Sequence, residues 1–156
     1  IREIADSAST ADEGAWHQYA MTYDGSETAA GITLYRDGSS IASSESSGGS
    51  YSGLRQVTAL NIGRWNGVAN ANGKMNEASI WNKELSAAEV DEIYNSGAPA
   101  DLGDHSAKAN LLAWYRLGEG DAVGSNQITD WAAGGLGTHF GTATNMEAGD
   151  IQSDVP

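Results

Sequence analysis

The 156-residue sequence has no cysteine, only two prolines and one phenylalanine, and no long apolar run. Without cysteine the chain can form neither disulfide bonds nor thiolate metal and redox sites. A membrane-spanning helix needs roughly 18 consecutive apolar residues, and no segment approaches that length. We therefore expect no membrane insertion.

Basic side chains are also scarce, because 8 lysines and arginines stand against 21 aspartates and glutamates, for a net charge of −13. The phosphates of nucleic acids and anionic lipid surfaces would be repelled by such a chain. We therefore expect no nucleic-acid partner. The same charge leaves divalent cations as plausible ligands.

The residues that are abundant indicate β structure. Twenty glycines, together with Ser, Thr, Asn and Asp, separate short apolar segments, as is typical of a sandwich or barrel. The length fits one domain. Five tryptophans and six tyrosines provide rings with polar tips, which suit half-buried positions or binding surfaces.

Alternating segments predict the strands. Residues 16–23 (WHQYAMTY) have one mostly apolar face and one mixed face. Residues 31–43 contain Asp37-Gly38 between alternating runs, which favours a tight hairpin with positive φ at both turn residues. In residues 74–82, Met75 and Ile80 break the alternation, so we expect a β-bulge near Asn76 or Glu77. Further strands are predicted at residues 57–65, 110–117, 128–131 and 137–143, of which 110–117 is apolar on both faces, as in a covered central strand.

One helix is predicted at about residues 87–95. Ser86 and Glu89 have the spacing of a capping box, and Leu85 with Val90 forms the matching hydrophobic staple. Gly97 is placed to end the helix, and the proline two residues later prevents its continuation. A helix this short needs to dock on the sheet.

Several motifs occur in a characteristic order: WHQYAMTYDG with ITLYRDG, then LNIGRWNG, then GKMNEASIWNKELSAAEVDEIYNSGAP, and finally NLLAWYRLGEG. This order resembles the laminin-G-like and pentraxin-like domains of the concanavalin A-like lectin/glucanase superfamily, over residues 16 to about 120. The resemblance implies an all-β fold, a jelly-roll sandwich of two antiparallel sheets with one short α-helix packed on it.

Only about fifteen residues precede the first motif, fewer than the strands that such domains usually carry there. We treat residues 1–156 as one domain that lacks or permutes its first strands, with the tail at 118–156 as the candidate for completing the sheets. The tail also resembles the C-terminal regions of phage virion proteins. An open sheet edge would favour a homo-oligomer or a neighbouring structural protein as partner.

The superfamily includes laminarinase-type glycosidases, whose carboxylates lie on one strand as Glu-x-Asp-x-x-Glu. The nearest match is residues 89–94, where Tyr94 replaces the last glutamate and the segment is predicted to be helical. Retaining hydrolysis needs two carboxyl groups about 5–5.5 Å apart across the sugar. We therefore expect no enzyme activity.

Calcium is the one cofactor left open, since no cofactor is otherwise required. Carboxylate oxygens that could contribute belong to Asp24, Asp37 and Asp130, but each lies in a turn context, where aspartate most often binds its own backbone. The calcium-binding acids that the pentraxin resemblance implies have no counterpart in residues 63–67, which bring an arginine instead.

A sugar site would combine an aromatic platform with amides. The candidates are Trp65, Asn66, Asn70, Asn72 and Tyr51. Trp16, Trp81 and Trp114 are instead expected to be core or sheet-face residues.

The sequence thus favours a non-catalytic β-sandwich module on a virion or other extracellular surface, serving assembly or attachment. The alternatives are a lectin that binds cell-surface glycans through the Trp65 loop and, as a third reading, a laminarinase-like glycosidase.

Overall fold

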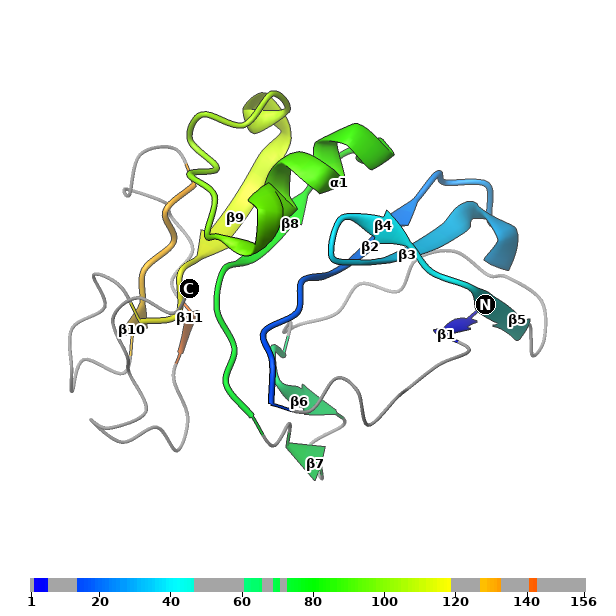
Figure 1. Cartoon of the computed structure of the whole chain (residues 1–156), viewed down its shortest axis with the longest axis horizontal. Coiled ribbons are helices and arrows are strands. Elements are labelled where there is room, and N and C mark those ends of the chain that lie inside the picture. Colours follow the sequence, from blue (N-terminus) through cyan, green and yellow to red (C-terminus); the bar gives the residue numbers. More distant parts are fainter. Residues whose placement is uncertain are drawn as a thin grey trace.

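A computed structural model describes residues 2–5, 14–46, 61–65, 69–70, 73–118, 127–132 and 141–142 (Figure 1). Every strand pair in this part of the chain is antiparallel, and one α-helix accompanies the strands. The predicted fold class, an antiparallel all-β domain with one short helix, is confirmed. No helix among the described residues is long and apolar enough to cross a membrane.

The strands form five small ladders, β1–β5, β2–β3–β4, β6–β7, β8–β9 and β10–β11. Their bounds are β1 Arg2–Ala5, β2 Tyr19–Tyr23, β3 Ile32–Arg36, β4 Ser39–Ser40, β5 Ser43–Ser46, β6 Arg64–Trp65, β7 Ala69–Asn70, β8 Ala78–Trp81, β9 Leu111–Tyr115, β10 Gln127–Ile128 and β11 Gly141–Thr142. The helix α1 spans Ala87–Tyr94, and short 3-10 turns occupy Ala29–Gly31, Asn95–Gly97 and Lys108–Asn110.

The hairpin between β3 and β4 is the predicted one. Asp37 and Gly38 form its turn with φ of 51° and 75°, so both residues adopt the left-handed conformation that such two-residue turns require. A Cβ at Gly38 would lie 2.6 Å from the Asp91 carboxylate of α1. The tip of the hairpin therefore sits directly against the helix.

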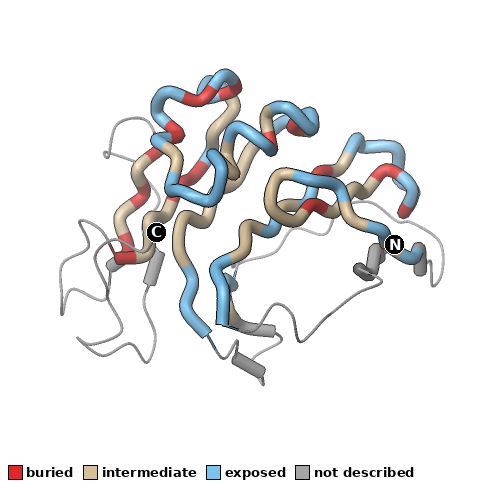
Figure 2. Tube along the Cα trace, in the orientation of Figure 1, coloured by how far each residue is buried: buried red, intermediate tan, exposed pale blue. Residues whose placement is uncertain are grey.

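The mixed face of β2, rather than its more apolar face, points inward. Ala20 is half-buried and Thr22 is buried, whereas Tyr19 and Met21 are 59% and 67% exposed. Figure 2 shows this alternation along the strand. An apolar pattern thus identified the strand without identifying the face that enters the core.

The irregularity predicted near Asn76 or Glu77 lies elsewhere. The β8–β9 ladder has its register shift between Ile80 and Trp81. Glu77 takes a left-handed φ of 56° immediately before β8 begins, so Met75 lies outside the ladder. The break in alternation that suggested a bulge therefore reflects the turn at Glu77, which precedes the strand.

The centre of β9 is covered on both faces, as predicted, because the neighbouring residues Ala113 and Trp114 are both buried. The described part of the tail runs beside this strand. Asp130 bridges to Tyr115, and the Trp131 amide donates to the Trp114 carbonyl at 2.7 Å. In the tail, β10 ends at Ile128, where the predicted segment 128–131 was expected to begin, and β11 lies within the predicted segment 137–143, whose other residues lie outside the described part of the chain.

Helix α1 begins at the predicted capping box. The Glu89 amide donates to Ser86 Oγ at 3.3 Å, and the Ser86 amide donates to Glu89 Oε2 at 2.8 Å. The helix ends at Tyr94, slightly earlier than expected, because Asn95 already adopts the left-handed conformation that ends a helix. This position tolerates asparagine better than most residues.

Two adjoining hydrophobic clusters meet beneath α1. The first contains the buried residues Tyr35, Leu85, Val90 and Ala107, and the second contains Leu102, Trp114 and Ala132. Trp81 and Ile93 pack against both clusters. The helix therefore joins the β2–β3–β4 unit to the β8–β9 unit, as Figure 1 shows.

Candidate functional site

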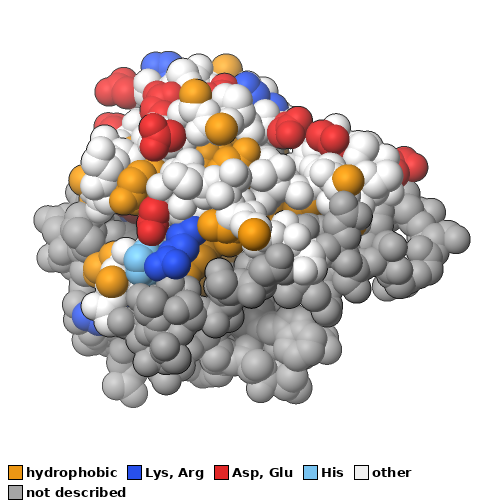
Figure 3. Space-filling model, turned by 45° about the vertical axis from the view of Figure 1, so that its right-hand side comes forward, with side chains coloured by type: hydrophobic (Ala, Val, Ile, Leu, Met, Phe, Trp, Pro, Cys, Tyr) orange, Lys and Arg blue, Asp and Glu red, His pale blue; other side chains and the backbone are white. Residues whose placement is uncertain are grey.

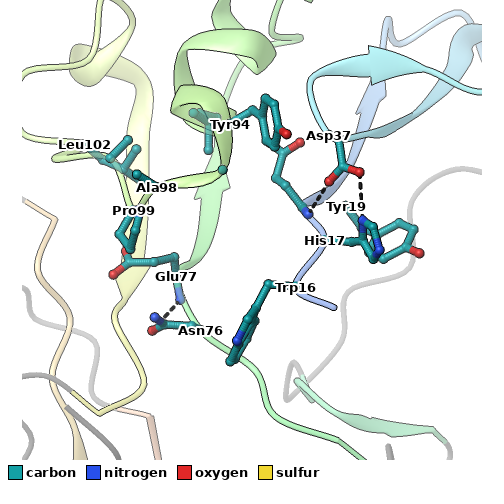
Figure 4. A pocket seen from close by; sticks show the side chains of 14 residues that line it. Trp16, His17, Tyr19, Asp37, Asn76, Glu77, Tyr94, Ala98, Pro99 and Leu102 are labelled. Carbon is teal, nitrogen blue, oxygen red and sulfur yellow. Dashed lines mark hydrogen bonds and ion pairs between the residues drawn. The ribbon is translucent and has the colours of Figure 1, made fainter. Parts of the chain in front are cut away.

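An open groove of about 290 Å³ lies below the C-terminal end of α1, between the segment leading into β2 and the segment leading into β8 (Figure 4). The described residues that line it come from four parts of the chain. They are Trp16, His17, Gln18, Tyr19, Asp37, Asn76, Glu77, Ile93, Tyr94, Gly97, Ala98, Pro99, Ala100 and Leu102.

A hydrogen-bonded group built around Asp37 forms one wall. Asp37 Oδ1 accepts from the Gln18 amide at 3.0 Å, and Asp37 Oδ2 lies 2.7 Å from His17 Nδ1. Arg36 Nη2 lies 3.1 Å from His17 Nε2, and arginine can only donate. The neutral ring that satisfies both contacts carries its proton on Nδ1, which donates it to Asp37.

The same contacts decide the charge of Asp37. Partial burial acts to raise the pKa of Asp37, but the hydrogen bonds from His17 and the Gln18 amide, together with the positive charge of Arg36, outweigh it. The pKa of Asp37 is therefore held below its ordinary value. This wall presents a fixed carboxylate.

Gln18 links the wall that contains Asp37 to helix α1, which lies above the groove. Its side-chain Nε2 donates to the Val90 carbonyl at 3.4 Å, and its Oε1 accepts from the Gly38 amide at 3.2 Å. One side chain thus links the segment before β2, the β3–β4 turn and α1.

The opposite wall is held by Glu77. Glu77 Oε2 accepts from Trp114 Nε1 at 2.6 Å, and Oε1 accepts from Arg116 Nε at 3.2 Å. The Arg116 guanidinium lies 5.5 Å and 5.7 Å from the ring centres of Trp114 and Trp131, within cation–π range. In Figure 4 the Asn76 and Glu77 side chains extend to the side of their backbone away from Trp16.

Aromatic rings stand at the mouth of the groove. Trp16 is 41% exposed and Tyr19 is exposed on the neighbouring β2 position. Figure 4 shows the Trp16 ring in the opening between the two walls. On the surface in Figure 3, acidic side chains are spread over the upper part of the face, and a histidine lies beside a basic side chain nearer its middle.

Trp16 is the site residue that the sequence interpretation missed. It was expected in the core or on a sheet face, but β2 begins only at Tyr19, so Trp16 lies in the segment before the strand. A usable signal was present, since three of the four residues 16–19 carry a ring. For Trp114, which is buried, and Trp81, which is half-buried, the expectation is confirmed.

The predicted Trp65 loop is partly a hairpin. Trp65 ends β6 opposite Ala69, and Asn70, expected in the loop, belongs to β7 opposite Arg64. Asn66, Asn72 and Tyr51 lie outside the described residues.

The three aspartates proposed as calcium ligands each accept hydrogen bonds from backbone amides. Asp24 Oδ1 accepts from the Ser26 amide at 2.7 Å, and hydrogen bonds from Ser26 lower the pKa of Asp24. Asp130 is buried, and its Oδ1 accepts from the Trp114 and Ala132 amides, both at 2.9 Å. Across the described residues, no group of three or more His, Asp or Glu is placed to hold a metal ion.

The segment at residues 89–94 lies on α1, as expected. Glu89 accepts from Lys83 Nζ at 2.6 Å as well as from the helix cap, and Glu92 accepts from the Ser106 amide at 2.8 Å. Both carboxylates therefore hold the helix in place.

The laminin-G family model that describes the concanavalin A-like lectin/glucanases superfamily matches residues 2–91. The chain belongs to this superfamily. The match includes Trp16, Asp37 and Glu77 and ends within α1, and it confirms the resemblance carried by the sequence motifs. Searches of curated proteins and of solved structures found no match.

Proposed function

We propose that this chain is a non-catalytic attachment module on a virion or other extracellular surface, and that it binds a glycan in the groove below α1. The observation that carries the proposal is the partly exposed Trp16 ring at the mouth of that groove, in a chain of the concanavalin A-like superfamily.

The composition of the groove suits a sugar. An aromatic ring can stack on the C–H face of a pyranose, while polar groups around it bind the hydroxyls. Small-molecule sites usually measure about 300–1,000 Å³ and combine apolar walls with a few polar groups. At about 290 Å³ the groove would accommodate a short part of a glycan.

The arrangement of the carboxylates supports binding rather than hydrolysis. Glycoside hydrolysis requires one carboxylic acid that is protonated and can donate to the leaving group. The lowered pKa of Asp37 opposes that role, and Glu77 is already engaged by Trp114 and Arg116. Incubation with laminarin and other β-glucans should release no reducing sugar. Hydrolysis that disappears in Glu77→Gln, but not in Glu92→Gln, would establish a glycosidase instead.

Glycan-array binding by the wild type and by Trp16→Ala tests the groove. We expect the substitution to abolish binding, because it removes the stacking platform. Leu112→Ala is the matched control, since Leu112 is 50% exposed on β9 and does not line the groove. Trp65→Ala tests the alternative site. Loss of binding in Trp65→Ala with full binding in Trp16→Ala would transfer the site to the β6–β7 hairpin.

A second candidate function is assembly, favoured by the outer face of β2. The Tyr19 and Met21 side chains are both exposed on this face. Exposed large apolar side chains can mark a surface where chains associate. Light scattering should then detect an oligomer that Met21→Lys dissociates, and a monomer at all concentrations would remove the assembly role.

A further inference from the structure

The charged residues in the described lining of the groove are acidic. Its described lining includes the carboxylates Asp37 and Glu77 but no lysine or arginine. Two arginines lie nearby, outside the lining, and both are directed at groups of the walls. Ligand phosphates, sulfates and carboxylates are normally bound by arginine or lysine.

The first arginine, Arg36, is oriented by the Asp37 wall. Its Nε lies 3.6 Å from Asp37 Oδ2, and its Nη2 contacts His17 Nε2. Asp37 stays ionised because its pKa lies below the ordinary value. The guanidinium is therefore already engaged by the wall.

The second arginine, Arg116, is oriented by the opposite wall. It binds Glu77 Oε1 and lies over two indole rings. Its partner Glu77 is among the residues that line the groove, whereas Arg116 is not. An anionic ligand would thus approach a described lining that contains two acidic residues and no basic one, in a chain of net charge −13.

We propose that the groove selects uncharged pyranose units and discriminates against glycans that carry sulfate or carboxylate groups. This inference rests on the proposed sugar-binding function and specifies its ligand class. The Trp16 ring supplies contact area that does not depend on charge, and the two walls supply repulsion against anions.

The test compares matched neutral and anionic glycans. Laminarihexaose and N-acetyllactosamine, each with its monosulfated derivative, would be titrated into the full chain by calorimetry at about 20 mM and about 500 mM sodium chloride. We expect the neutral member of a binding pair to bind at least about tenfold tighter at low salt. At high salt, screening should reduce the ratio of the two affinities, mainly because the sulfated glycan binds more tightly.

The controls locate the effect in the groove. Trp16→Ala should abolish binding of the neutral glycan, whereas Leu112→Ala should retain both affinity and ratio. Glu77→Gln removes one of the two negative charges of the lining and should reduce the preference for the neutral glycan. The salt series tests the same charge effect without altering the protein.

The possible results are distinct. A sulfated glycan that binds as tightly as its neutral counterpart, or more tightly, overturns the selectivity and leaves the sugar-binding function standing. Preference for the neutral glycan that survives in Trp16→Ala places the selectivity outside the groove and also overturns the inference. Absence of binding to every glycan, on these probes and on the array, overturns the proposed function and the inference together.

Discussion

The junction beneath α1 and the mouth of the groove are built in opposite ways, although they share one segment of chain. At the junction, Val90 is completely buried, and both polar ends of the Gln18 side chain are hydrogen-bonded. Two residues earlier, Trp16 leaves 41% of its surface in solvent. Within this short segment, Gln18 therefore links the β3–β4 turn to α1, whereas Trp16 is partly exposed to solvent.

His105 shows how a buried polar side chain is accommodated at the junction. The buried ring accepts from the Ala107 amide through Nδ1 at 3.0 Å, which leaves Nε2 to donate to the Glu89 carbonyl, also at 3.0 Å. The ring also packs against Trp81, with centroids 4.7 Å apart. Buried polar groups are costly unless they are hydrogen-bonded, and this arrangement avoids the cost. Substitutions at the junction should therefore change the stability of the protein, and substitutions at the mouth of the groove should change ligand binding.

The largest expected effect on stability comes from opening a cavity at the junction. Leu85→Ala removes a buried staple residue and should lower the free energy of unfolding by about 2–5 kcal/mol. Leu112→Ala makes the same chemical change at an exposed site, where the expected loss is about 0.5 kcal/mol or less. Urea unfolding measures both. Equal losses would show that the cluster beneath α1 does not carry the stability.

A smaller loss of stability is expected from alanine at two glycines with positive φ, and comparing the two variants distinguishes backbone strain from contact with α1. Gly25 and Gly38 have similar positive φ values of 80° and 75°, but only Gly38 lies against α1. Alanine at either position should cost about 1–2 kcal/mol for the left-handed backbone. Gly38→Ala should cost more, because its Cβ meets Asp91. Identical melting temperatures for the two variants would contradict the close approach of hairpin and helix.

Acid should weaken the helix cap. The hydrogen bond from Lys83, followed by those from Ser86, lowers the pKa of Glu89 from 4.5 to about 2. A folded-state pKa below the unfolded one stabilises the protein above pH 4.5, and this contribution disappears as the pH falls toward 2. Wild type should therefore exceed Glu89→Gln in stability at pH 7 and approach it near the acid limit, in unfolding curves measured across that range. A difference that is constant with pH would refute the linkage.

Metal removal should have the smallest effect. Asp24, Asp37 and Asp130 all accept hydrogen bonds from protein groups, so we propose that the fold and the groove need no calcium. Dialysis against EDTA should change neither the melting temperature nor glycan binding by Trp16. A rise of several degrees on adding calcium chloride would establish a metal site.

Local chemistry explains what could be predicted without the structure. The capping box at Ser86 and Glu89 depends on residues three apart, and the β3–β4 turn depends on the adjacent residues Asp37 and Gly38. Both features were therefore predictable. Alternation was less informative at β8, where a turn at Glu77 interrupts it and the register shift occurs at Trp81 instead.

The groove could not be predicted in the same way. Trp16, Asp37, Glu77 and Tyr94 are separated by roughly twenty to forty residues at each step, and no local spacing indicates that they meet. The sequence drew attention to Trp65 because it follows a strand pattern beside several asparagines. For Trp16 the only local signal was the run of rings at residues 16–19, and that run does not indicate a cavity.

Composition and short-range pattern by themselves determined the antiparallel β class, the superfamily, the capped helix and the tight hairpin, because each depends on neighbouring residues or on an ordered set of motifs. Tertiary structure alone decided which face of β2 is buried, where the Glu77 and Asp37 carboxylates are held, and that Trp16 stands at an opening. These outcomes depend on how α1 docks between two ladders. Docking is set by packing and hydrogen bonds between distant segments, which no local pattern encodes.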